Sequence, residues 1–316
     1  MSTAAGQSHD RQAEALRRAL GDTILSLLNN DSVVEIMANP DLTLWADFAG
    51  GEGMKRISNI DPIQSMSIIG CSAAMLNRVV SIDNPILECE LPVFGCRFEA
   101  LIPPLVAAPT FTIRKKAKLI FSLLDYVERG MLNQQRYEAV ISAIRQKRNI
   151  LISGGTGTGK TTFANAILKE IAEADEESRI VMIEDVAELQ CSAKNTVQLL
   201  TNGETGMQQL LRATMRLRPD RIVVGEVRDS AALALLKAWN TGHPGGLGTV
   251  HANDCNAALH RIAMLIEESG ARAQPELISE AINTIVSIKR TATGRVIDEV
   301  AEVRGYEDRK YVIEIV

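Results

Sequence analysis

The sequence predicts an α/β protein of two domains, in which a largely parallel, doubly wound sheet follows a smaller α+β domain. In the second half of the 316-residue chain, apolar runs of strand length alternate with helical segments, the pattern of a parallel sheet with helical crossovers. One of the strand-to-helix junctions is rich in glycine, and sheets of this kind bind ligands at the carboxyl ends of their strands. The first half instead combines short strands, broken by proline and glycine, with two helices, which is typical of a small sheet domain.

The elements of the second domain follow from apolar runs and from apolar residues at helical spacing. Strands are expected at 149–153, 179–184, 196–200, 221–226 and 247–251. Helices are expected at 135–147, 160–172, 206–217, 230–240 and 256–269. We assign this domain to residues 134–316, after a linker at 119–133.

The first domain is assigned to residues 1–118. Helices are expected at 10–28 and 62–80, where apolar residues recur every three or four positions. Strands are expected at 33–37, 43–48, 86–91, 96–102 and 110–114, with Asn39-Pro40-Asp41 as the first turn.

The glycine-rich junction, GGTGTGKT at 154–161, fits the P-loop pattern G-x-x-x-x-G-K-[ST]. A buried strand precedes it and a helix follows it, which is the context that a phosphate site requires. Glycines let the backbone wrap a phosphate with its N–H groups pointing inward, and the helix adds the positive end of its dipole. Lys160 is expected to reach the β- and γ-phosphates and Thr161 to place a hydroxyl on Mg²⁺. The predicted phosphate-binding residues are Gly154, Gly155, Thr156, Gly157, Thr158, Gly159, Lys160, Thr161 and Thr162.

Two carboxylates stand at the ends of apolar strands, at the sheet edge where the P-loop is expected. Glu184 follows the run 180–183, and Glu226 follows 222–225. One of them can help to hold Mg²⁺ through its water shell, and the other can position the attacking water. We favour Glu226 as the water-activating residue with Glu184 as its partner on the metal, and the reverse assignment stays open.

Two histidines lie in the glycine-rich segment 241–252. An imidazole there could donate a hydrogen bond to a γ-phosphate and report its loss, so His243 and His251 are candidate nucleotide-site residues.

Five arginines lie at 212, 216, 218, 221 and 228. Arginine pairs with phosphate and carboxylate, so some of them could serve a neighbouring subunit's nucleotide, whereas most are expected in subunit contacts or salt bridges.

Composition sets further limits on the function. The formal net charge of −5 and the 4% of aromatic residues argue against direct nucleic-acid binding, although a local basic groove stays open. No apolar run reaches the length of a membrane span, and the polar N-terminus does not resemble a signal peptide. The five cysteines form no C-x-x-C pair. A cytoplasmic protein with free thiols is expected.

Taken together, these motifs resemble those of the secretion-superfamily ATPases, which serve type IV secretion, type II secretion and type IV pili. The resembling segments are 154–161 (P-loop), 183–189 (aspartate box), 211–229 (Walker B region) and 241–252 (histidine box). In the first domain, 97–104 and 110–115 resemble the conjugation and type IV secretion branch. The tetracysteine insert of the type II branch is absent, and 280–290 lacks the motif of the pilus-retraction branch.

The resemblance implies a hexameric ring of RecA-like domains that uses ATP and Mg²⁺ and acts on other secretion-system proteins at the inner membrane. It implies a cytoplasmic location, with peripheral attachment to the cytoplasmic face of that membrane as a variant. It also brings in Arg97 of the first domain as a nucleotide contact. Arg114, in the basic run before the domain junction, is a second candidate, because a basic residue at a hinge can reach phosphates.

Three alternatives stay open on the sequence. The chain could serve a type IV pilus or a type II secretion system. It could be a nucleotide-gated docking scaffold with little turnover. It could also be a nucleic-acid translocase, which salt-dependent DNA binding would reveal.

Overall fold

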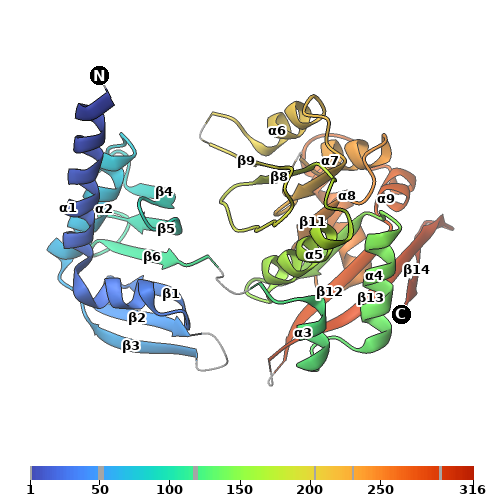
Figure 1. Ribbon diagram of the computed structural model, residues 1–316, viewed down its shortest axis with the longest axis horizontal. Helices are drawn as coiled ribbons and strands as arrows, with labels where there is room; N and C mark the ends of the chain where they lie inside the picture. The colour runs from blue at the N-terminus through green and yellow to red at the C-terminus, as the bar shows by residue number, and fades with distance from the viewer. Residues whose placement is uncertain (1, 49–52, 117–119, 203, 230, 292–293) are drawn as a thin grey trace. The chain divides into compact units, whose positions relative to one another are not determined.

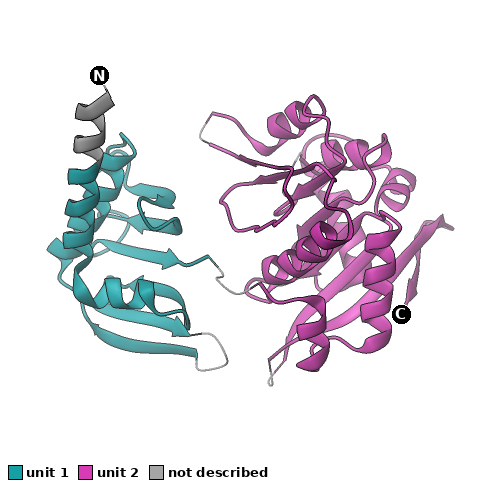
Figure 2. Ribbon diagram, in the orientation of Figure 1, with its two compact units in different colours: residues 1–118 teal, residues 119–316 magenta. Residues whose placement is uncertain are grey.

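The computed structural model describes residues 2–48, 53–116, 120–202, 204–229, 231–291 and 294–316 (Figure 1). Internal contacts divide the chain into two compact units, residues 1–118 and residues 119–316 (Figure 2).

The first unit is an antiparallel sheet with two helices packed on it. Its strands are β1 (Val33–Ala38), β2 (Thr43–Phe48), β3 (Gly53–Asn59), β4 (Ile86–Leu91), β5 (Cys96–Leu101) and β6 (Thr110–Arg114), in the spatial order β3-β2-β1-β6-β5-β4. Helix α1 (Ser2–Asn29) is interrupted at Gly21, where φ is 68°, and it packs on α2 (Pro62–Met75). Buried side chains such as Leu20, Ile69 and Phe98 form one core between the helices and the sheet.

Three elements of this unit differ from the sequence prediction. Helix α1 begins at Ser2 and not at residue 10. Helix α2 ends at Met75 and not near residue 80, because Asn77 adopts a left-handed conformation with φ 54°. Strand β3 was not predicted. It lies at the edge of the sheet and is mostly exposed, so it carries little of the apolar alternation by which a strand is recognised.

The second unit is built on an eight-stranded sheet in the order β14-β13-β12-β7-β11-β10-β8-β9. Its parallel strands are β7 (Ile150–Gly154), β8 (Ile180–Glu184), β9 (Thr196–Leu200), β10 (Arg221–Val224), β11 (Leu247–Val250) and β12 (Thr284–Thr291). Strands β13 (Gly294–Glu307) and β14 (Lys310–Ile315) extend the sheet antiparallel to its neighbours.

Helices cover both faces of this sheet. On one face lie α3 (Leu123–Glu128), α4 (Gln134–Arg145) and α5 (Lys160–Ala174). On the other lie α6 (Met207–Thr214), α7 (Ala231–Asn240), α8 (Cys255–Glu268) and α9 (Pro275–Ala281). Alternate strand residues enter opposite cores: Leu151 of β7 joins the second group, whereas Ile150 and Ile152 join the first. The predicted doubly wound α/β fold is confirmed.

The segment expected to be a linker, 119–133, instead contributes to the second unit. Ser122 and Asp125 form a capping box at the start of α3. The side chains of Leu123, Tyr126 and Leu132 are buried in the core against α5. Residues 117–119 lie outside the described residues.

The parallel strands bring four chain segments to one edge of the sheet. The carboxyl ends of β7, β11, β10 and β8 are neighbours in that order, because adjacent strands run in the same direction. The P-loop therefore lies at the same edge as the segments that follow β8, β10 and β11.

Candidate functional site

The P-loop owes its shape to glycines at specific positions. Gly157 and Gly159 have φ of 71° and 96°, in the left-handed region that side chains disfavour. A Cβ on Gly154 would lie 2.6 Å from Thr158 Oγ1 and 2.8 Å from the carbonyl oxygen of Ile288. Larger residues at these three positions would therefore force the loop to open.

The side chain of Lys160 is folded into the loop. Its Nζ donates to the carbonyl oxygens of Gly154 and Gly155, at 2.9 and 3.0 Å, and lies 3.2 Å from His251 Nδ1. The residue is 8% exposed, so this ammonium is largely shielded from water. The ammonium group thus lies inside the loop that, by its sequence pattern, is expected to surround a phosphate.

Thr161 faces a carboxylate that the sequence analysis missed. Its hydroxyl donates to Glu188 Oε2 at 3.2 Å. Asn165 of α5 holds the same loop, donating to the Glu188 carbonyl and accepting from the backbone of Gln190. Glu188 stands in a loop four residues after Glu184, and its place in the resembling segment 183–189 was the only signal that could have indicated it.

Glu184 is placed differently from its predicted role. Its side chain is buried, and Oε1 accepts from the backbone N–H groups of Glu188 and Leu189 at 3.0 and 2.8 Å. Oε2 accepts from Gln198 Nε2 at 2.7 Å. Because both oxygens already accept hydrogen bonds from the protein, these contacts give no support to the expected role of Glu184 on the metal or the attacking water. Glu184 instead anchors the loop that presents Glu188.

The environment of Glu184 also affects its ionisation. Burial raises the pKa of this carboxyl, and the hydrogen bonds from Gln198, Leu189 and Glu188 oppose the rise only in part. Gly225 of the neighbouring loop packs against it, because a Cβ there would lie 2.9 Å from Glu184 Cγ.

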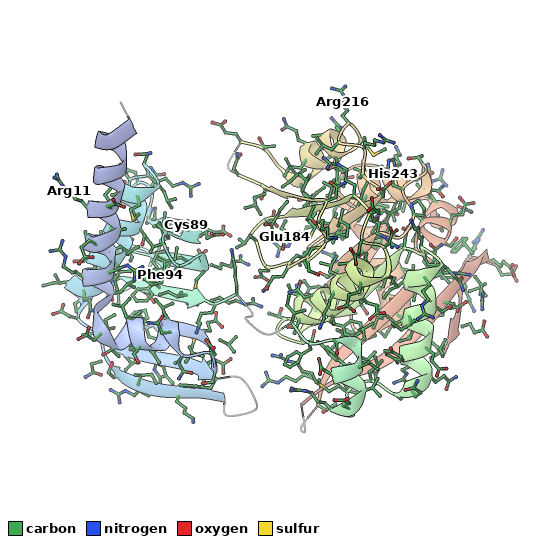
Figure 3. All side chains as sticks on the ribbon, in the orientation of Figure 1. Arg11, Cys89, Phe94, Glu184, Arg216 and His243 are labelled. Atoms are coloured by element: carbon green, nitrogen blue, oxygen red, sulfur yellow. The ribbon has the colours of Figure 1, made fainter. Side chains whose placement is uncertain are left out.

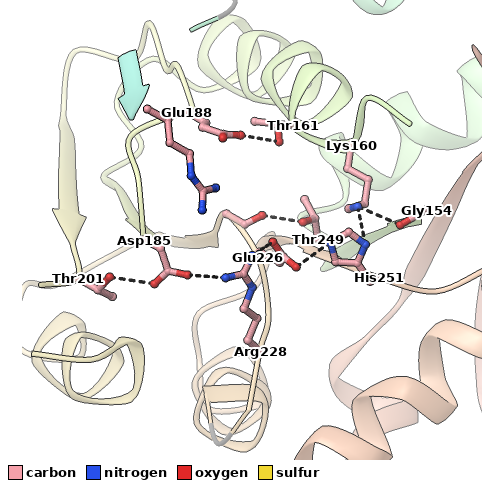
Figure 4. A network of polar contacts seen from close by, with 12 residues as sticks. Gly154, Lys160, Thr161, Asp185, Glu188, Thr201, Glu226, Arg228, Thr249 and His251 are labelled. Atoms are coloured by element: carbon pink, nitrogen blue, oxygen red, sulfur yellow. Dashed lines mark hydrogen bonds and ion pairs between the residues drawn. The ribbon is translucent and has the colours of Figure 1, made fainter. Parts of the chain in front are cut away.

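Glu226 is the centre of a network that runs along the sheet edge (Figure 4). Its Oε1 lies 2.9 Å from His251 Nε2, and its Oε2 accepts from Arg228 Nη2 at 2.6 Å. Arg228 continues to Asp185 Oδ2 at 3.4 Å, and Asp185 accepts from the hydroxyl of Thr201. Burial alone would raise the pKa of Glu226, but Arg228, His251 and Lys160 outweigh it, so the pKa is lowered and the group is ionised at neutral pH.

His251 connects Glu226 to Lys160. Burial and the Lys160 charge lower the pKa of the imidazole, and Glu226 opposes them in part. A lysine ammonium can only donate and a carboxylate can only accept, so Nδ1 accepts from Lys160 and Nε2–H donates to Glu226. The structure thus selects one neutral tautomer. Thr249 of β11 donates its hydroxyl to the carbonyl oxygen of Gly225 at 2.7 Å, which ties the end of β11 to the loop after β10.

The structure does not bring His243 to this site. It precedes β11, whereas His251 follows that strand, so His243 lies near the amino end of the strand and His251 at its carboxyl end. His243 Nδ1 lies 3.3 Å from the carbonyl of Ala238, on α7. Figure 3 shows it well apart from Glu184. The prediction that His243 contacts a nucleotide held in this chain's own P-loop is therefore not supported.

The arginines singled out in the sequence lie in different environments. Arg221 is buried and donates to the carbonyl of Gly245, so it is an internal support, and Arg228 belongs to the Glu226 network. Arg212, Arg216 and Arg218 are exposed. Arg97 and Arg114 are register partners in the first unit, where Arg97 pairs with Glu88 at 3.2 Å, and their role in nucleotide binding stays a prediction.

The residues at the P-loop suit a magnesium ion held jointly with a ligand. The described ranges contain no group of three or more His, Cys, Asp or Glu that would hold a metal by itself. The Thr161 hydroxyl and the Glu188 carboxylate are oxygen donors, which Mg²⁺ prefers, and this ion is usually bound through few protein ligands plus phosphate and water.

Within the described ranges, every helix is too short or too polar to span a bilayer.

The P-loop, the loops that carry Glu188 and Glu226, and His251 together form a site of the kind expected in a secretion ATPase. The chain belongs to the family of type II/IV secretion system proteins, whose model matches residues 83–302. Over 308 residues it is 46% identical to the probable conjugal transfer protein TrbB of Sinorhizobium fredii, covering 98% of this chain and 94% of that protein. It is 30% identical to the type IV secretion system protein VirB11 of Bartonella henselae, covering 85% and 88%.

The fold agrees with solved structures. The ATPase DotB of Yersinia pseudotuberculosis superposes with a TM-score of 0.66 at 19% identity, covering 89% of this chain and 78% of that one. The resemblance recognised in the sequence is confirmed, and the fold is that of a secretion ATPase with a RecA-like P-loop domain and a smaller N-terminal domain.

Proposed function

We propose that the chain hydrolyses ATP to power assembly or substrate transfer by a conjugative type IV secretion system. The observation that carries this proposal is the continuous contact from Lys160 in the P-loop through His251 to Glu226. The P-loop ammonium, an imidazole and a carboxylate with a lowered pKa are in contact, which supports the proposal. The relatives named for conjugal transfer, matched over nearly the whole chain, supply the biological context.

The triphosphate binds along the P-loop. The backbone N–H groups of residues 155–161 and the amino end of α5 attract its oxygens, and Lys160 neutralises charge on the β- and γ-phosphates. The Lys160 ammonium exchanges its present carbonyl acceptors for phosphate oxygens. Thr161 and Glu188 would hold Mg²⁺, and the ion would supply positive charge beside the phosphates.

Glu226 positions the attacking water. The water oxygen forms a bond to the γ-phosphorus while its proton passes to Glu226 and on to solvent, the bond from that phosphorus to the bridging oxygen breaks, and ADP and inorganic phosphate result. Glu226 accepts a hydrogen bond from the water, because its lowered pKa keeps it ionised. His251 and Arg228 hold the carboxylate in position, since each engages one of its oxygens.

Further parts of the proposal concern assembly. The chain works as a homo-oligomeric ring, a hexamer by analogy with its family, next to other secretion-system proteins on the cytoplasmic side of the inner membrane. The exposed Arg212, Arg216 and Arg218 are available for contacts between copies. A specific activity that stays flat down to monomeric dilution would contradict the ring.

The test is ATP turnover and ATP affinity of the full chain. Lys160→Ala should abolish turnover, because losing a phosphate-clamping cation costs several kcal/mol of transition-state stabilisation. Glu226→Gln should bind ATP and turn over at least about 100-fold more slowly, the usual scale of acid–base assistance. Turnover of Lys160→Ala within a factor of two of wild type would exclude this site. A wild type that binds ATP without multiple turnover would favour the docking scaffold.

A further inference from the structure

A side chain outside the sequence motifs lies against the P-loop. Arg295 is the second residue of β13, and a Cβ on Gly159 would lie 3.2 Å from its Cδ and 3.6 Å from its Nη1. Gly159 directly precedes Lys160. The guanidinium of Arg295 therefore covers the side of the loop to which a side chain at position 159 would point.

The register of the sheet explains how Arg295 arrives there. Strand β12 runs parallel to β7 with Ile288 beside Gly154, so its last residues continue past the end of β7. Strand β13 returns antiparallel, with Arg295 opposite Arg290. Ile297, two residues further along β13, is buried in the core that contains α5, so Arg295 projects from the same face.

The Arg295 side chain is exposed to solvent. Among the described residues, no carboxylate or carbonyl forms an ion pair or hydrogen bond with its guanidinium, in contrast to Arg228 and Arg304, which both pair with glutamates. Nearby, Tyr126 is buried edge-on against Phe163 of α5, with ring centroids 5.1 Å apart. Arg295 and Arg129 both act on the pKa of the Tyr126 hydroxyl, which burial raises, so both charges lie close to this ring.

We infer that Arg295 forms the subsite for the purine base of the nucleotide, with its guanidinium plane stacked on the base. This inference rests on the proposed function, because the phosphates must occupy the P-loop. The base and ribose then extend beyond the loop. Arginine is weakly hydrated and planar, so it stacks on a ring face without needing an acidic partner. Every purine offers such a face, so this subsite favours neither ATP nor GTP strongly.

The test compares ligands with and without a base. Affinities of the full chain for MgATP and for magnesium tripolyphosphate are measured by calorimetry, for wild type and Arg295→Ala. We expect MgATP to bind about tenfold more weakly to the variant, within the range of stacking contributions to a single base. Tripolyphosphate affinity should change less than about twofold. GTP should lose affinity in parallel with ATP.

Two further variants separate stacking from charge. Arg295→Lys keeps the charge and loses the plane, so it should bind MgATP nearly as weakly as Arg295→Ala. Arg145→Ala removes an exposed arginine at the end of α4, which leads into the opposite end of β7, and should leave both affinities unchanged. Thermal unfolding of Arg295→Ala should match wild type, because the side chain is exposed.

The possible results distinguish failure of the base subsite from failure of the proposed function. Equal losses for MgATP and tripolyphosphate, or full rescue by Arg295→Lys, would show a phosphate contact and overturn the inference. An Arg295→Ala variant with wild-type ATP affinity would overturn the inference while leaving the proposed function intact. A wild type that binds neither ligand would refute the proposed function, and the base subsite with it.

Discussion

The carboxylates Glu184 and Glu188, four residues apart, should respond to substitution in opposite ways. Glu184 is buried and accepts three hydrogen bonds that hold the following loop, whereas Glu188 is half-buried and faces Thr161. We expect Glu184 substitutions to lower the free energy of unfolding. Glu188→Gln should instead change the magnesium requirement of turnover.

The magnitudes follow from the hydrogen bonds. Glu184→Ala leaves three donors without their acceptor, and each buried unsatisfied group costs about 1–3 kcal/mol, so a loss of about 3 kcal/mol or more is expected. Glu184→Gln keeps an acceptor for the two backbone N–H groups, and Gln198 can turn its amide to accept from the new donor, so its loss should be about 1 kcal/mol. Glu188→Gln should stay within about 0.5 kcal/mol of wild type.

Denaturant unfolding measures the first effect, and turnover against magnesium concentration measures the second. Glu188→Gln should raise the magnesium concentration for half-maximal turnover about tenfold or more, the scale of altered metal sites. Folded Glu184→Gln should keep the wild-type value. If Glu184→Gln raised the magnesium requirement as strongly as Glu188→Gln, our placement of Glu184 as a loop anchor would be refuted.

The pH dependence of stability gives a second readout for Glu184. Its pKa is raised above the ordinary value of 4.5, so the folded state holds the proton more tightly than the unfolded state. Its contribution to stability is therefore present below pH 4.5 and decreases as the pH rises through the raised pKa. Glu184→Gln should lose this decrease, and an unchanged profile would contradict the assigned environment.

The remaining predictions concern three other groups. Glu226 has a pKa lowered below 4.5, so its stabilising contribution is present above that pH and lost as the pH falls through the lowered pKa; unfolding of Glu226→Gln should lack this acid-side loss. His251→Ala should reduce turnover at least tenfold, as removal of a group that orients a carboxylate does, whereas His243→Ala at the same protein concentration should reduce it less than twofold, and a reversed order would refute the placement of the two histidines. Arg114→Ala should weaken ATP binding or slow turnover while changing stability by less than about 1 kcal/mol, and unchanged ATP kinetics would remove the first domain from the nucleotide site.

The P-loop could be recognised from sequence because its constraints are local. Lys160 and Thr161 keep a fixed spacing from the glycines, and the flanking strand and helix are adjacent in the chain. Glu188 could not be found in this way, because its position depends on hydrogen bonds from its own loop to the buried Glu184, and on Asn165 in another element.

His243 illustrates the opposite failure. It lies eight residues before His251 in one glycine-rich segment, and the sequence suggested a common role. Strand β11 runs between them, and about 3.3 Å of rise per residue carries the two histidines to different edges of the sheet. Helix α3 was missed because it is short and is stabilised by packing of Leu123 and Tyr126 on α5, a tertiary contact without a local pattern.

The carbonyl acceptors of Lys160 have a consequence for which anions the site retains. Because Gly154 and Gly155 already provide oxygens to the ammonium, an incoming anion gains only the difference between its own hydrogen bonds and those it displaces. A lone phosphate offers little beyond this exchange, whereas a chain of phosphates adds contacts along the whole loop and helix end. We therefore expect inorganic phosphate alone to bind weakly, because the two backbone carbonyls compete with it for the Lys160 ammonium, and we expect a triphosphate to be needed to displace them.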